Sequence, residues 1–111
     1  MRIDDDERVY IFWDVIATAD PTGGTVALEV TDVAGTPVNG SPVSMQWTNS
    51  PVQSGATWTG RTRTTKMFTG TSKTPQGTDI GLTKARYMGQ PIVTMPDGQV
   101  IAGPQQPIDV G

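Results

Sequence analysis

Two short segments of this 111-residue chain carry side chains suited to chemistry or recognition. The first is acidic: Asp4, Asp5, Asp6 and Glu7 are adjacent carboxylates, the hard oxygen ligands that Ca²⁺ takes. The run lacks the spaced Asp-x-Asp-x-Asp-Gly pattern of a calcium loop, and adjacent acids are more often solvated. We therefore expect no metal here and treat the four acids as a candidate interaction surface.

The second segment is basic. Arg61 and Arg63 stand two residues apart, so that on a strand both side chains point to the same side, and Lys66 follows them. Such a group could meet phosphates, but the chain carries a net charge of −3, the reverse of the basic footprint of a nucleic-acid-binding domain. We expect the acidic surface of another protein as the partner, and no nucleic acid.

Charge is divided along the chain. Residues 1–34 hold eight acids and two bases, a net charge of −6, whereas residues 35–111 hold six bases and three acids, a net charge of +3. If the two parts present different faces, neighbouring copies could dock acidic patch to basic patch, and such head-to-tail contacts close into rings when the rotation permits. The alternative is that the charged side chains lie on the solvent-exposed faces of the sheets and have no role in docking.

Aromatic side chains suggest a further kind of site, a platform on which sugar rings stack. Trp13 and Trp47 fall on the apolar faces of their predicted strands, which favours the core. Trp58 lies among Thr and Gly and is the aromatic residue most expected to be exposed, with Tyr87 as its partner in a sugar platform. A carbohydrate- or host-surface-binding module is therefore the alternative function.

The residue types needed for most enzymes are missing. The chain has no His and no Cys, so that Ser-His and Cys-His nucleophile pairs, thiolate metal sites and disulfides are excluded. No Gly-rich phosphate loop precedes a helix. We expect no enzyme and no cofactor, with a hydrolase of unrecognised type as a distant third hypothesis. No apolar run approaches the ~20 residues of a membrane helix, and the acidic start does not resemble a secretory signal, which predicts a protein used without export through its own signal.

Thirteen Gly, nine Pro and abundant Thr favour short strands over helices. Residues 8–16 are apolar on both faces, which predicts a central or covered strand, whereas residues 25–31 alternate as a half-buried strand. The Thr-rich residues 56–69 predict one or two strands with a solvent-exposed outer face. Residues 70–77 are expected to form a flexible connection. Further strands are expected at 43–48, 79–88, 91–95, 99–102 and 108–110.

Together these elements predict one all-β domain over residues 1–111. Seven or eight short antiparallel strands, with turns about every ten residues, are typical of a β-sandwich of immunoglobulin-like type or of a small barrel. Residues 1–7 are expected to form a polar N-terminal arm, and residues 103–111 a C-terminal edge segment.

Two stretches of sequence carry a resemblance. The acidic start running into residues 8–13 (RVYIFW), and residues 56–60 (ATWTG) followed by RTRTT, resemble small β-rich virion structural proteins of tailed phages that infect actinobacteria. The resemblance implies a capsid accessory or head–tail connection component that assembles with other virion proteins, and with copies of itself, in the host cytoplasm. It implies no catalytic motif and no fixed site residues.

Overall fold

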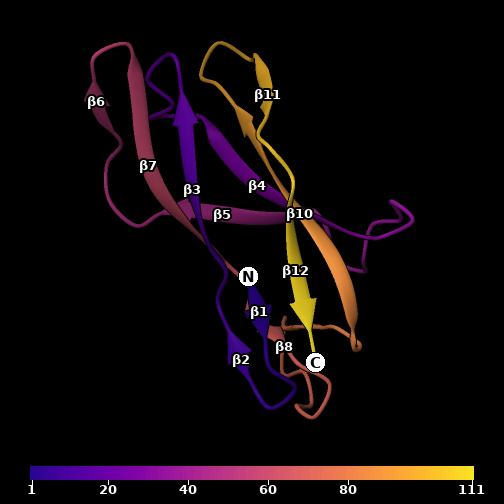
Figure 1. Ribbon diagram of the computed structural model, residues 1–111. Helices are drawn as coiled ribbons and strands as arrows, with labels where there is room; N and C mark the ends of the chain where they lie inside the picture. Colours follow the sequence, from indigo (N-terminus) through magenta and orange to yellow (C-terminus); the bar gives the residue numbers. More distant parts are fainter.

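The chain folds entirely from β-strands. The computed structural model describes residues 1–111 and contains twelve strands in two sheets with no helix (Figure 1), which confirms the predicted all-β class. No helix is present that would have the length and apolar character to cross a lipid bilayer. The strands are β1 (Arg2–Ile3), β2 (Arg8–Val9), β3 (Phe12–Ala17), β4 (Thr25–Asp32), β5 (Val43–Trp47), β6 (Val52–Ser54), β7 (Thr57–Thr64), β8 (Phe68–Thr69), β9 (Ile80–Gly81), β10 (Ala85–Thr94), β11 (Val100–Ala102) and β12 (Gln106–Val110).

The larger sheet has nine strands and curls into a half-barrel (Figure 1). Its main path runs β1-β12-β10-β4-β5-β7-β3, with β11 paired to β10 and β6 paired to β7. Strands β2, β8 and β9 form the smaller sheet. The strands outnumber the seven or eight predicted because several of them, such as β1, β2, β6 and β9, have only two or three residues, too few to show an alternating pattern in the sequence.

The core lies on the inner face of the large sheet, where residues alternate as predicted for β4. Val26, Leu28 and Val30 are buried there, because successive side chains of a strand point to opposite faces. The same cluster takes up side chains from most of the other strands, among them Val43, Met45, Ile80, Leu82 and Tyr87.

The prediction of one central strand over residues 8–16 is wrong. The chain changes sheets within it: β2 joins the small sheet, and β3 becomes the last strand of the large one. No second layer covers the outer side of β3, so Phe12 and Ile16 remain 46% and 71% exposed, whereas Trp13 and Val15 are buried. On one face of β3 the apolar residues are therefore part of the core, and on the other face they are exposed to solvent.

The Thr-rich strand β7 has the solvent-exposed outer face that was predicted, and its inner face is buried. Arg61 and Arg63 occupy its outer face, so Thr62 and Thr64 must point inward, and both are fully buried. Their hydroxyls are satisfied there: Thr62 Oγ1 donates to the carbonyl of Trp13 at 2.8 Å, and Thr64 Oγ1 donates to that of Lys66 at 2.8 Å. Thr suits this position because it combines strand propensity with a polar group that can bond to backbone.

The two chain ends are tied into the sheet. β1 pairs in parallel with β12, Ile3 is fully buried, and the N-terminal ammonium of Met1 donates to the carbonyl of Pro107 at 2.9 Å. Residues 1–7 are therefore not a polar arm, because one apolar side chain in them is part of the core. β12 lies between β10 and β1 and not at an edge, so the expectation of a C-terminal edge segment over residues 103–111 is also corrected.

An ion pair fastens the small sheet. Asp79 precedes β9, and its carboxylate accepts from Arg8 Nε at 2.6 Å and Nη2 at 3.0 Å, and from the N–H of Gln76 at 3.0 Å. The Asp79 side chain is 4% exposed and that of Arg8 is 40% exposed. The hydrogen bond from Arg8 is the largest influence that holds the pKa of Asp79 below its ordinary value.

This pKa shift predicts a loss of stability in acid. Because the unfolded chain takes up the Asp79 proton at a higher pH than the folded chain does, the stabilisation is complete above the ordinary Asp pKa and is lost as pH falls through the lowered folded value. Asp79→Asn is expected to be less stable than the parent at pH 7 and to lose less stability on acidification. Urea midpoints at about pH 7 and about pH 3, either side of the ordinary Asp pKa, measure both effects. An equal acid loss in the two proteins would contradict the prediction.

Candidate interaction surface

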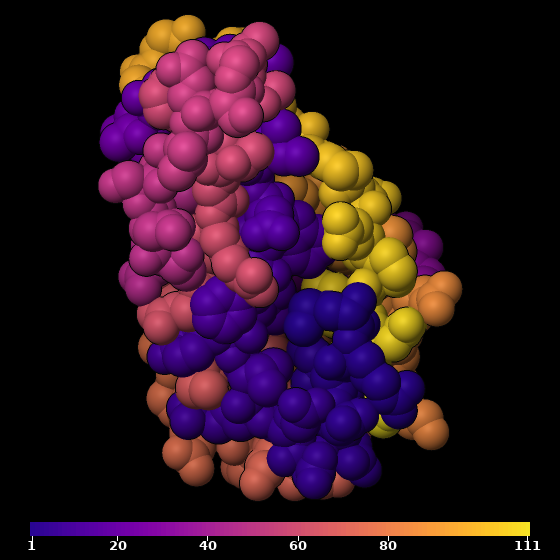
Figure 2. All heavy atoms as spheres, turned by 60° about the vertical axis from the view of Figure 1, so that its left-hand side comes forward, coloured from indigo at the N-terminus to yellow at the C-terminus, as the bar shows by residue number.

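The outer sides of β3, β7 and β6 form one continuous surface, which we call the β3–β7 face. Six side chains define it: Tyr10, Phe12, Ile16, Val52, Arg61 and Arg63. Strand register brings them together, since Phe12 lies opposite Arg63, and Ile16 and Val52 both lie opposite Thr59 from either side of β7. Figure 2 shows this side of the molecule, with β6 and β7 in pink beside β3 in purple.

Two arginines of this face are stacked on aromatic rings. Arg61 Cζ lies 5.2 Å from the centre of the Phe12 ring, and Arg63 Cζ lies 4.1 Å from that of Tyr10. Cation–π contacts of this kind stabilise by about 0.5–1 kcal/mol at exposed sites and favour one orientation of the guanidinium. The predicted pairing of Arg61 and Arg63 on one side of a strand is thus present, together with two aromatic residues that the sequence pattern did not associate with them.

Arg61, Arg63 and Lys66 form no ion pair within the chain, although Asp14 lies opposite Arg61 in the strand register. The only ion pairs are Arg2–Asp4, Arg8–Asp79 and Arg86–Asp109. No side-chain hydrogen bond is donated by Arg61, Arg63 or Lys66, and Nε of Arg63 is buried without a partner. The remaining donors of these side chains are therefore available to a ligand or to another protein.

Lys66 extends the same surface toward the small sheet. It lines an open depression of about 360 Å³ together with Tyr10, Arg8 and Asp79, and Tyr10 is the ring on which Arg63 stacks. The structure thus places Arg61, Arg63 and Lys66, which we call the basic patch, along one surface with Tyr10 between Arg63 and Lys66.

On the other side of Arg61 the face is apolar. Ile16 is 71% exposed and Val52 is 63% exposed, and both line a shallow groove of about 440 Å³ with Asp14 and Arg61. Exposed apolar side chains that cluster across neighbouring strands, beside unpaired Arg, resemble the composition of protein–protein interfaces.

Trp58 does not belong to this face. The alternation along β7 puts it on the side opposite to Arg61 and Arg63, where it is half-buried. Tyr87 is only 6% exposed, and its hydroxyl is hydrogen-bonded to Thr83 at 3.0 Å. The expected sugar platform of Trp58 and Tyr87 is therefore wrong, because Tyr87 is a core residue whose ring is covered.

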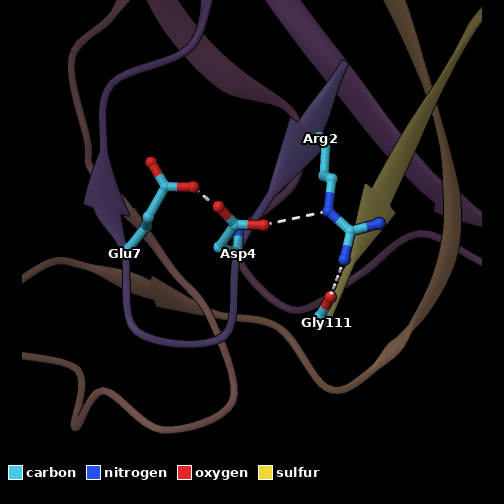
Figure 3. A network of polar contacts seen from close by, with 4 residues as sticks. All are labelled: Arg2, Asp4, Glu7 and Gly111. Carbon is cyan, nitrogen blue, oxygen red and sulfur yellow. Dashed lines mark hydrogen bonds and ion pairs between the residues drawn. The ribbon is translucent and has the colours of Figure 1, made fainter.

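The four N-terminal acids form a fixed turn between β1 and β2, which we call the acidic turn (Figure 3). The N–H of Asp4 donates to Glu7 Oε1 at 2.7 Å, and the N–H of Glu7 donates to the carbonyl of Asp4 at 3.1 Å. Arg2 binds Asp4 Oδ1 through Nε at 2.9 Å and the carbonyl of Gly111 through Nη2 at 2.6 Å. The carboxylates of Asp4 and Glu7, expected as part of the interaction surface, are thus used to hold the turn.

Asp5 and Asp6 keep their carboxylates free of ion pairs. Both are exposed, and the one side-chain hydrogen bond that they make is from Ser72 Oγ, 3.4 Å from Asp5 Oδ2. The structure gathers no three Asp or Glu side chains in a position to share a metal ion. What this turn offers is negative charge on a rigid backbone.

Sequence reasoning missed Phe12, Ile16 and Val52 as surface residues because their apolar character favours a core. A signal was present for β3: Phe12 and Ile16 share their side of the strand with Asp14, while the other side carries Trp13 and Val15 without charge. For Val52 the sequence holds no comparable signal, because its strand has only three residues, all exposed.

Comparison with known proteins yields no relative for this chain: no protein-family model, no curated protein and no solved structure matches it.

Proposed function

We propose that this chain is a non-enzymatic structural protein of a phage virion, a capsid accessory or head–tail connection component that acts through protein–protein contacts. The observation that carries the proposal is the β3–β7 face, where the guanidinium groups of Arg61 and Arg63 lie over aromatic rings and form no ion pair. Arg and aromatic side chains are over-represented among the residues that dominate binding energy at protein interfaces.

The apolar part of the same face supports the proposal. Ile16 and Val52 are large, exposed and opposite the same residue of β7, and burial of such side chains contributes about 25 cal/mol per Å² of apolar area. An interface centred on them would have an apolar middle and a charged margin formed by Asp14 and Arg61, the usual anatomy of a specific contact.

The finer description of the fold belongs to this proposal. The curled sheet and the small sheet would act as one small sandwich or barrel, immunoglobulin-like in type, that presents its outer surface to neighbouring virion proteins. Assembly would take place in the host cytoplasm, with no cofactor, nucleic acid or membrane as partner, in line with the resemblance carried by residues 8–13 and 56–65.

Binding to purified capsid, portal and tail proteins of the same phage tests the proposal, and two Val residues make a matched pair. Val52 and Val100 are 63% and 62% exposed, but only Val52 lies on the β3–β7 face. Val52→Asp is expected to weaken binding by at least ~10-fold, because a charge would be buried in the apolar middle of the interface, whereas Val100→Asp should bind as the parent does. If the parent binds none of these virion proteins, the proposed function is wrong.

A further inference from the structure

We propose that the basic patch binds the acidic turn of a second copy of this chain. The inference rests on the proposed function, since it names one self-contact within a symmetric virion assembly. It follows from two groups of charges that the fold leaves without ion pairs on each molecule: Arg61, Arg63 and Lys66 on one side, and Asp5 and Asp6 on the other.

The basic side is preorganised for a carboxylate. The rings of Phe12 and Tyr10 cover one face of the Arg61 and Arg63 guanidinium groups. The donors of Arg61 and the Nη donors of Arg63 are left to a partner, since Nε of Arg63 is buried. A guanidinium edge is a planar fork that binds a carboxylate through two parallel hydrogen bonds. Two such forks lie two residues apart on one strand, with the ammonium of Lys66 nearby, which matches a partner that presents more than one carboxylate.

The acidic side is equally rigid. The N–H of Ser72 donates to the carbonyl of Asp5 at 2.7 Å, and the N–H of Gly70 donates to that of Glu7 at 2.9 Å. These bonds, with the reciprocal bonds between Asp4 and Glu7, fix the backbone while Asp5 and Asp6 stay exposed to solvent. A binding loop that is already ordered loses little conformational entropy when it docks.

The two groups do not meet within one molecule. No ion pair joins them, and the molecule is elongated, 44 × 27 × 21 Å, with the acidic turn at the end that carries β2 and β8 (Figure 1). Both the first residues of the chain and β7 are open to solvent on the side seen in Figure 2. Each copy therefore offers one turn and one patch, and repeated contacts of this kind produce a reciprocal dimer, a ring or a chain.

The net charge gives the contact a recognisable salt dependence. Each copy carries a net charge of −3, so two molecules repel one another except where the basic patch meets the acidic turn. The attraction is short-ranged, because the Debye length is ~8 Å at 0.15 M ionic strength and ~3 Å at 1 M. Self-association should accordingly weaken as salt rises, whereas an apolar contact would strengthen or remain unchanged.

Charge reversal on each side tests the contact, with sedimentation velocity of the purified chain as the measurement. Arg61→Glu with Arg63→Glu reverses the patch, and Asp5→Lys with Asp6→Lys reverses the turn. Each double variant alone is expected to self-associate at least ~10-fold more weakly than the parent, because like charges then face each other. A 1:1 mixture of the two should recover association, since the reversed patch of one variant then meets the reversed turn of the other.

Lys73→Glu with Lys84→Glu is the matched control, because it makes the same change in net charge at two exposed lysines outside the patch. This variant should associate more strongly than the patch variant. If Arg63→Glu disturbs folding, as judged by circular dichroism, Arg61→Glu with Lys66→Glu replaces it, since Arg61 is exposed.

A parent chain that stays monomeric at low salt, or a mixture that does not recover association, overturns this inference. A monomer that still binds a capsid or tail protein through Val52 would contradict the self-contact and support the proposed function. A chain that self-associates as described but binds no virion protein would support the self-contact and contradict the proposed function.

Discussion

Phe68→Ala is expected to lower the free energy of unfolding by about 3–5 kcal/mol, the range measured when a buried Phe is truncated. Phe68 is fully buried and lies in β8, the middle strand of the small sheet, between Val9 on β2 and Ile80 on β9. Its ring belongs to the same core cluster as the inner side chains of the large sheet, so it joins the two sheets. Because a domain of this size is stabilised by only ~5–15 kcal/mol, a large share of the total is lost.

The chain contains a matched control for this substitution in its only other Phe. Phe12 is 46% exposed on β3, and its ring contacts the guanidinium of Arg61. Phe12→Ala should therefore cost less than ~1 kcal/mol, about the value of one exposed cation–π contact. Urea denaturation followed by tryptophan fluorescence compares the two variants. Equal losses of stability would show that the small sheet does not close the core in the way described.

Gly70→Ala adds only one methyl group, but it is expected to lower the free energy of unfolding by about 3 kcal/mol. A Cβ atom at Gly70 would overlap the carbonyl oxygen of Asp4 and lie 2.7 Å from Cα of Asp5. These are backbone atoms of the acidic turn, so no side-chain rotation relieves the overlap. The turn must move away, and the hydrogen bond from the Gly70 N–H to the carbonyl of Glu7 must lengthen or break.

Gly77→Ala separates this overlap from ordinary backbone strain. Gly77 has φ +56°, and a methyl group added there would meet no atom within 4 Å, so the Ala variant should cost about 1 kcal/mol for the left-handed conformation alone. Urea midpoints give the two costs, and amide hydrogen exchange at Ser72 reports whether the acidic turn has detached. The prediction fails if Gly70→Ala is no more destabilising than Gly77→Ala, or if Ser72 stays protected in both.

Several features of this protein were predictable from local pattern. Gly, Pro and Thr content excluded long helices, and the strict alternation of Val26, Leu28 and Val30 set the buried face of β4. The spacing of Arg61 and Arg63 placed both on one side of a strand, where the structure has them. These predictions succeeded because side-chain direction along a strand depends only on neighbours in the sequence.

Other features depended on contacts between distant segments. The exposure of Phe12 and Ile16 follows from the position of β3 at the end of the sheet, and the burial of Ile3 from its pairing beside Val110. Thr62 and Thr64 are buried because the face of β7 that they share is the one turned toward the core. The type of a residue, apolar or polar, indicates whether its burial is favourable. It does not indicate whether another part of the chain packs over that residue.

The sequence by itself determined the all-β class, the lack of His and Cys chemistry, and which charges exist. Only the tertiary structure decided which of those charges are paired within the chain and which are left over. The physical reason is that pairing depends on distance in space: Arg8 binds Asp79 across 71 positions of the sequence, whereas Arg61 and Arg63 lie over aromatic rings and form no ion pair.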